Sequence, residues 1–240
     1  MEDFKRFAVY YAPEPGAFTD FTAAWLGWDA QTHTARAHPD VRGLPLPVAK
    51  ITATPRKYGF HGTIKPPFRL AEGSDVTGLV RDLAELCSRL GPVEMPGLEL
   101  RQLSGFLALV PKGDTAGLAV LAGKVVSGLD MHRAPPSQAE LDRRRARPLS
   151  GQQEANLAQW GYPYVMEEFR FHLTLSGQLP DADCAAIIDA LGPLLAPLLP
   201  RPFRVQELCL FGEDAKGRFH LLQRHALTGE TAATNFSSAS

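Results

Sequence analysis

The chain has 240 residues, of which 45% are hydrophobic and 21% are charged, and its formal net charge is −1 at pH 7. These values are typical of a globular protein with one large domain or two lobes, and the near-zero net charge argues against binding along long nucleic acid while remaining compatible with small anionic substrates. The three cysteines are far apart without metal-ligand spacing, and no secretory leader or uninterrupted membrane span is evident, so we expect a cytoplasmic protein without a metal or other cofactor.

The first half of the chain predicts the order strand, helix, strand, helix, hairpin. Apolar periodicity and turn residues place these elements at residues 6–12, 18–26, 57–65, 76–90, 98–103 and 105–111. Pro66 and Pro67 are expected to end the strand at 57–65, because proline cannot donate a hydrogen bond to a neighbouring strand.

The second half repeats the last part of this order, strand, helix and hairpin, after one further helix and an insertion. The helix covers 112–129, and the polar insertion, rich in Arg, Gln, Pro and Gly, covers about 130–168. The later elements are a strand at 169–176, a helix at 181–191 and two strands at 203–211 and 218–227. Small polar residues at 229–240 predict a disordered tail.

Because strand, helix and hairpin occur twice, we expect a single domain over residues 1–228 with an internal duplication. The predicted class is α+β: a two-lobed fold with pseudo-two-fold symmetry, antiparallel sheets lining a central cleft, and helices on the outside. In this arrangement the strands at 57–65 and 169–176 would face each other across the cleft.

Those two strands carry the same pattern, His61-Gly62-Thr63 in one and His172-Leu173-Thr174 in the other. Side chains two residues apart share one face of a strand, so each histidine lies beside its threonine. A third Phe-His pair, at His220, is followed by leucine instead of a threonine two positions on, and is interpreted as an ordinary strand residue.

A pair of imidazoles, one neutral and one protonated, can move protons onto and off a phosphate ester near neutral pH. The Thr63 and Thr174 hydroxyls could donate hydrogen bonds to nonbridging phosphate oxygens. Lys65 and Arg170 are predicted to share the motif faces and to add charge-assisted contacts. The residues do not indicate which histidine is the base and which is the acid.

The sequence resembles the two-histidine phosphoesterases, whose mark is a pair of His-x-Thr strands in a duplicated α+β fold. Residues 58–68, 133–144 and 160–164 are similar to the branch of that superfamily associated with phosphonate-utilisation operons. The resemblance implies metal-independent opening or formation of a small cyclic phosphodiester, on a phosphoribosyl-type intermediate of phosphonate metabolism. It also implies that His61, Thr63, His172 and Thr174 are the catalytic residues.

Further substrate contacts are expected from Tyr10, Tyr58, Arg133 and Arg144. Tyr10 could instead be a packing residue, and the arginines between 133 and 147 could form a solvated helix face.

Three other functions remain open at this level. The chain could be a phosphodiesterase or ligase-like enzyme acting on RNA 2′,3′-cyclic phosphates, or a metallohydrolase that uses the histidines as ligands, although no nearby Asp, Glu or His completes such a set. It could also be a non-catalytic module that binds a phosphorylated ligand. The expected partner in each non-RNA case is a small phosphorylated molecule, and the oligomeric state is left open.

Overall fold

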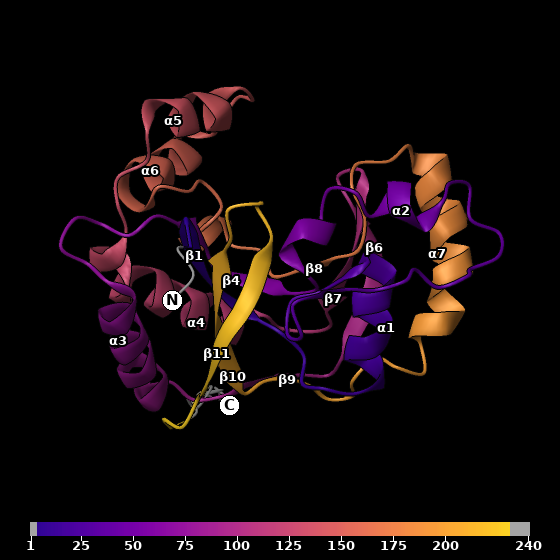
Figure 1. Ribbon diagram of the computed structural model, residues 1–240, viewed down its shortest axis with the longest axis horizontal. Coiled ribbons are helices and arrows are strands. Elements are labelled where there is room, and N and C mark those ends of the chain that lie inside the picture. Colours follow the sequence, from indigo (N-terminus) through magenta and orange to yellow (C-terminus); the bar gives the residue numbers. More distant parts are fainter. Residues whose placement is uncertain (1–3, 231–240) are drawn as a thin grey trace, which may run out of the picture.

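A seven-stranded antiparallel sheet forms the centre of the protein, for which the computed structural model describes residues 4–230 (Figure 1). The strand order is β11-β10-β1-β4-β8-β7-β6. The strands are β1 (Arg6–Tyr11), β4 (Gly62–Phe68), β6 (Leu98–Leu103), β7 (Phe106–Pro111), β8 (Leu173–Thr174), β10 (Glu207–Glu213) and β11 (Phe219–Ala226). Two further pairs lie outside it: β2 (Trp28–Asp29) with β3 (Thr34–Ala35), and β5 (Val93–Met95) with β9 (Phe203–Val205).

The helices are α1 (Ala17–Leu26), α2 (Val48–Ile51), α3 (Val76–Arg89), α4 (Ala116–Gly128), α5 (Gln138–Arg145), α6 (Gly151–Trp160) and α7 (Asp181–Leu195), with short 3-10 helices at Arg56–Tyr58, Asp130–His132 and Met166–Glu168. Helices α1, α2, α3, α4 and α7 supply residues to the core on one face of the sheet, whereas α5 and α6 supply none. Helix α3 shows the pattern: Asp75 caps its start, and Leu79, Leu83 and Cys87 recur at helical spacing and are buried.

The main core lies between the sheet and helices α1, α2, α3, α4 and α7. Alternate strand residues such as Val9, Ile64 and Leu173 point into it, whereas their neighbours, such as Tyr10, point to the opposite face. In Figure 1, α3 and α4 lie toward one end of the molecule, α1 and α7 lie toward the other, and α5 and α6 lie together at the top left. The face opposite the core carries Tyr10, whose ring stacks on the first motif histidine, His61.

The internal duplication is confirmed by the order of the elements. One repeat is β1-α1-β4-α3-β5-β6 and the other is β7-α4-β8-α7-β9-β10, with β11 added at the edge. From the centre of the sheet outward, β4-β1-β10 on one side matches β8-β7-β6 on the other, and the equivalent strands β5 and β9 pair with each other. The expected α+β class with pseudo-two-fold symmetry is thus correct.

The boundary between the repeats differs from the expectation. The hairpin of β6 and β7 joins the two repeats, because β6 is the last strand of one and β7 is the first strand of the other. Each repeat also places its last strand in the other half of the sheet: β6 pairs with β7, and β10 pairs with β1. The halves are therefore interleaved.

The two motif strands do not face each other across a cleft. They are hydrogen-bonded neighbours, β4 and β8, at the centre of a single sheet. Both are displaced from the expected ranges: β4 starts only at Gly62 and continues through Pro66 and Pro67, and β8 is two residues long. The pairing of β4 with β1 is irregular where the prolines offer no N–H to a neighbouring strand.

The insertion at 130–168 contains helices α5 and α6, each beginning with a capping box, and α5 buries none of its residues. No helix within residues 4–230 is long and apolar enough to cross a membrane. The tail expected at 229–240 lies, apart from its first two residues, outside the described part of the chain.

Candidate active site

The two motifs meet through a single antiparallel pairing, in which Gly62 lies opposite Leu173. This register places His61 opposite Thr174, and Thr63 opposite His172. Residues that are directly opposite each other point to the same face of a sheet, and Leu173 points into the core. All four motif side chains therefore lie together on the face opposite the main core, around the pseudo-two-fold axis.

Both imidazoles are held in the same way. Nδ1 of His61 lies 2.9 Å from the carbonyl oxygen of Gly59, and Nδ1 of His172 lies 2.8 Å from that of Arg170. A carbonyl oxygen only accepts, so Nδ1 donates its proton and Nε2 of each neutral ring keeps a free lone pair. Thr63 Oγ1 lies 3.3 Å from Nε2 of His61, so the free nitrogen and the hydroxyl are neighbours.

The surroundings of the two rings differ. His61 stacks on the ring of Tyr10, with ring centroids 3.9 Å apart and an angle of 27° between the planes. Burial is the main cause that lowers the pKa of His61 to about 4; the Gly59 carbonyl opposes this shift, and the nearby His172 adds to it. His172 lies 5.6 Å from the ring of Phe106, and burial lowers its pKa as well. Near neutral pH both free imidazoles are therefore mainly neutral.

Gly62, between the first His and Thr, has a packing role. A Cβ at this position would lie 2.3 Å from Cζ of Phe171, the residue before His172. The aromatic ring of one motif thus occupies the space that the middle residue of the other leaves open. Close contact between the two central strands depends on this glycine.

Two further tyrosines, Tyr58 and Tyr162, lie on the side of the site where His61 stacks on Tyr10. The ring of Tyr58 lies 5.8 Å from that of His61, and Arg144 lies over the ring of Tyr162, 4.4 Å from its centroid. Burial raises the pKa of Tyr10, and Tyr58 and Tyr162 raise it further. Tyr58 thus lies near His61, whereas Arg144 contacts Tyr162.

Comparison with known proteins places the chain in a family. A family model described as "Protein of unknown function (DUF1045)" matches residues 63–220. The chain belongs to the DUF1045 family. It is 35% identical over 192 residues to "Ribose 1,5-bisphosphate phosphokinase PhnN" of Janthinobacterium sp. (strain Marseille), a match that covers 78% of this chain and 42% of that protein. It is 34% identical over 215 residues to the protein of the same description from Laribacter hongkongensis (strain HLHK9), covering 88% and 49%.

The DUF1045 chain thus spans less than half the length of these two relatives. Among solved structures it is similar to E. coli LigT complexed with 3′-AMP, with 16% identity, a TM-score of 0.42 and coverage of 94% of this chain and 99% of that one. It is also similar to TT0787 of Thermus thermophilus, with 14% identity, a TM-score of 0.43 and the same coverage.

Lys65 of the DUF1045 chain does not reach the site, contrary to the expectation. Its ammonium is buried, donates to the Val126 carbonyl oxygen at 2.9 Å and lies 3.7 Å from Asp130. The register of β4 against β1 shifts between Tyr10 and Val9, so Lys65 pairs with Val9 and follows that residue toward the helices. Burial lowers its pKa to about 8.

Two predicted arginine contacts are also engaged elsewhere. Arg170 bends back to donate to the carbonyl oxygens of Glu167 and Phe169, at 2.9 and 2.7 Å. Arg133 makes a bidentate pair with Asp130 and donates to the carbonyl oxygen of Gln159 at 3.0 Å. These bonds hold loops in place: they occupy all three nitrogens of the Arg133 guanidinium and one terminal nitrogen of Arg170.

Tyr10 supports His61 instead of lying open to substrate, since its side chain is buried beneath the imidazole. Sequence reasoning missed Arg6 and Phe106, which border the site. The alternation of side chains between the two faces of a strand would have located both residues. Arg6 shares a strand face with Tyr10, and Phe106 shares one with Ala108. Within residues 4–230, no three His, Cys, Asp or Glu side chains are grouped so as to hold a metal ion.

Proposed function

We propose that this DUF1045 protein is a two-histidine phosphoesterase that opens, or in reverse forms, a small cyclic phosphodiester. The observation that carries the proposal is the Gly62–Leu173 register, which brings two imidazoles and two hydroxyls to one face. Both rings present Nε2 because both Nδ1 atoms are bound to backbone carbonyls. Two proton-transfer groups beside two hydrogen-bond donors suit in-line displacement at phosphorus.

His61 acts as the general base in the direction of ring opening. Its low pKa, about 4, keeps Nε2 free to accept the proton of the attacking water as the new P–O bond forms. His172, in its protonated form, donates the Nε2 proton to the ester oxygen that leaves as its P–O bond breaks. The hydroxyls of Thr63 and Thr174 donate to the nonbridging oxygens, whose charge grows in the transition state. In ring closure the two histidines exchange roles.

The substrate class is a phosphoribosyl-type cyclic phosphate of phosphonate metabolism. The relatives from Janthinobacterium and Laribacter are described as ribose 1,5-bisphosphate phosphokinases, and the present chain matches less than half of each. Water attack on a ribose 1,2-cyclic phosphate, with cleavage of the bond to O2, yields a ribose 1-phosphate. A 5-phosphorylated form would yield ribose 1,5-bisphosphate, which those descriptions name. The free, buried thiols of Cys87, Cys184 and Cys209 fit the cytoplasmic location of such metabolites.

Phosphorus NMR of the purified protein tests the proposal. The probes are ribose 1,2-cyclic, nucleoside 2′,3′-cyclic and ADP-ribose 1″,2″-cyclic phosphates, each with and without a chelator. We expect ring opening of the ribose 1,2-cyclic phosphate that persists in the chelator. Turnover that the chelator abolishes would contradict the two-histidine mechanism, and tight binding without turnover would indicate a non-catalytic module. Preference for nucleoside 2′,3′-cyclic phosphates would favour the RNA-end alternative.

A further inference from the structure

A cavity of about 690 Å³ lies beside Tyr58, between the start of the first motif and helix α5. Its charged lining is five cations against one carboxylate: Arg6, Lys57, Arg69, Arg143, Arg144 and Glu140. The whole chain, by contrast, has 25 Lys and Arg against 26 Asp and Glu. Positive charge is therefore concentrated at this place and does not reflect the general composition.

Two of the five cations are neutralised by carboxylates. Arg6 pairs with Glu213 through two hydrogen bonds, of 2.5 and 2.8 Å. Arg69 pairs with Glu140 at 3.1 Å. Both arginines are thereby fixed in position, and they help to shape the wall of the cavity.

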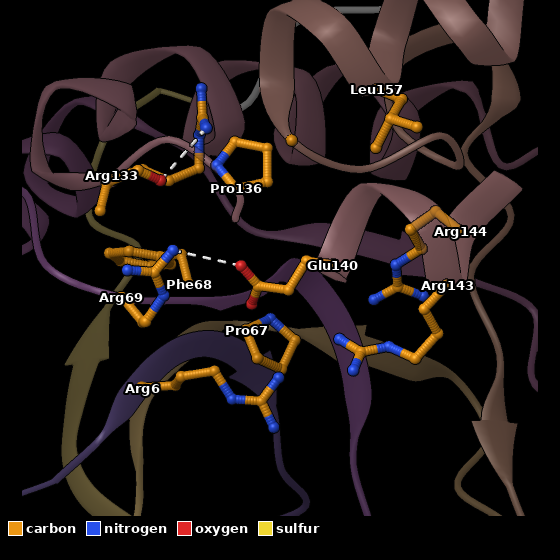
Figure 2. A pocket seen from close by; sticks show the side chains of 12 residues that line it. Arg6, Pro67, Phe68, Arg69, Arg133, Pro136, Glu140, Arg143, Arg144 and Leu157 are labelled. Atoms are coloured by element: carbon orange, nitrogen blue, oxygen red, sulfur yellow. Dashed lines mark hydrogen bonds and ion pairs between the residues drawn. The ribbon is translucent and has the colours of Figure 1, made fainter. Parts of the chain in front are cut away.

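The other three cations, Lys57, Arg143 and Arg144, have no ion-pair partner among residues 4–230. Figure 2 shows the adjoining pocket that shares most of this lining; the guanidinium groups of Arg143 and Arg144 extend from α5 toward Glu140 and Pro67. Three uncompensated cations around one space form a site for an anion with more than one charge, such as a phosphate monoester.

The helix that carries these arginines is attached to the sheet. Glu140 accepts hydrogen bonds from Arg69, at the end of β4, and from the Ser137 amide at the start of α5. Arg144 is positioned over the ring of Tyr162, 4.4 Å from its centroid. Helix α5 and the Arg144 guanidinium are thus held at a fixed place relative to the motif strand, as a binding site requires.

One residue, Tyr58, borders both the cavity and the proposed reaction site. Tyr58 lines the cavity, and its ring lies 5.8 Å from that of His61. A small molecule with a cyclic phosphodiester at the histidines can therefore extend past Tyr58 into the cavity. Its second end would meet Lys57, Arg143 and Arg144.

From this placement we infer that the substrate carries a second phosphate, a monoester bound by Lys57, Arg143 and Arg144 beside Tyr58. The inference rests on the proposed function for the cyclic end of the molecule. It narrows the substrate to compounds with one cyclic phosphodiester and one separate phosphate monoester. A reaction that phosphorylates the sugar, or one that starts from a sugar already phosphorylated, must come before this step.

The test compares two probes, ribose 1,2-cyclic phosphate with and without a 5-phosphate, by kcat/KM. We expect the 5-phosphorylated probe to be favoured by about tenfold to a hundredfold, since each hydrogen bond to a charged group contributes a substantial part of such a factor. In the double variant Arg143→Gln, Arg144→Gln this preference should fall to a few-fold, mainly through KM. The matched control is Arg147→Gln, which removes a nearby exposed arginine that does not line the cavity and should keep the preference.

Equal turnover of both probes by the wild-type protein would overturn the inference and leave the proposed function intact. A preference that survives in the double variant would overturn it too. If neither probe is turned over, the proposed function fails, and calorimetry with ribose 5-phosphate decides about the cavity. Binding to wild type that the double variant loses would support the anion site, and no binding would overturn it.

Discussion

The two halves of the molecule place the same motif in different surroundings. Tyr10 pairs with Thr63 in one half, and Ala108 pairs with Thr174 in the other, so these two positions are equivalent. The tyrosine ring stacks on His61, with centroids 3.9 Å apart, whereas the alanine offers no ring to His172, whose aromatic neighbour Phe106 lies 5.6 Å away. One residue thus differentiates two histidines that the duplication made alike.

What the two halves share is equally informative. Both imidazoles donate from Nδ1 to the carbonyl two residues earlier, and both threonines lie on the same strand face. The shared geometry fixes which nitrogen of each ring is free, and the unshared neighbour Tyr10 adds to the burial that lowers the pKa of His61. A base and an acid can therefore be made from one repeated pattern.

Among the changes considered, removing either imidazole should have the largest effect on turnover. His61→Ala and His172→Ala are each expected to lower kcat by roughly two to four powers of ten, because each ring transfers a proton in the same reaction. The measurement is steady-state turnover of a cyclic phosphate, with circular dichroism to confirm folding. Near-normal turnover by either variant would show that one half does the chemistry alone.

The buried, neutral state of His61 should make the fold sensitive to acid. The pKa of His61 lies at about 4 in the folded chain against its usual 6.5, so its stabilising contribution is complete above pH 6.5 and is lost as the pH falls toward 4. A difference of this size corresponds to about 3 kcal/mol in the free energy of unfolding.

Urea unfolding of wild type and His61→Asn at pH 7 and pH 4 measures this effect. The difference in the free energy of unfolding between wild type and His61→Asn should change by about 3 kcal/mol from pH 7 to pH 4, with wild type losing more stability in acid. His172→Asn should give a change of the same sign, because burial lowers the pKa of that ring as well. Parallel pH dependence in all three proteins would show that neither ring is buried in its neutral form.

The two threonines should contribute equally if the pseudo-two-fold symmetry governs phosphate binding. Thr63→Val and Thr174→Val each remove one hydrogen bond to a charged group, about 1.5 to 3 kcal/mol, or roughly tenfold to a hundredfold in kcat/KM. A large effect at one threonine and none at the other would place the phosphate to one side of the axis.

Gly62 tests the close packing of the two motif strands. Gly62→Ala places a Cβ against the ring of Phe171, and overpacking of this kind costs about 1 to 3 kcal/mol of stability. Thermal unfolding should show the loss, and the additional change Phe171→Leu should recover part of it. Gly151→Ala, where nothing lies within 4 Å of the new Cβ, is the control and should cost nothing. A fully stable Gly62→Ala would contradict the packing role.

The smallest expected effect comes from the ring beneath His61. Tyr10→Leu opens one side of the imidazole to water, so the pKa of His61 should rise by about one unit. The acid limb of the pH profile of kcat/KM should then shift to higher pH by the same amount. Tyr10→Phe keeps the stacked ring and should leave the limb in place. An unchanged profile in Tyr10→Leu would mean that this stacking does not distinguish the two halves.

The fold class was accessible from the sequence because it depends on local patterns. Apolar periodicity and turn residues located α3 (Val76–Arg89) and the hairpin at 98–111 almost to the residue. The pairing of β4 with β8 was not accessible, because the partner of a strand is decided by the packing of the whole chain. Helices α5 and α6 could have been found from the boxes Ser137-x-x-Glu140 and Ser150-x-x-Gln153.

The site divides in the same manner. Alternation placed His61, Thr63, His172 and Thr174 together on their strands, and a register that the sequence could not reveal brought the two pairs side by side. Lys65 was misplaced because alternation assumes a regular strand, and β4 is irregular at that point. Arg133 was misassigned because a guanidinium can satisfy a carboxylate and backbone carbonyls as readily as a phosphate, and Arg170 likewise donates to two backbone carbonyls.

The exchange of β6 and β10 between the repeats makes the fold a single-chain counterpart of a domain-swapped dimer. A half-length ancestor would have needed a second copy both to complete its sheet and to assemble its pair of imidazoles, and the two rings would then have been chemically identical. Joining the copies through the short turn after β6 allowed substitutions on one side only. Covalent fusion, in this view, is what permitted the two copies of one ancestral histidine to acquire different neighbours.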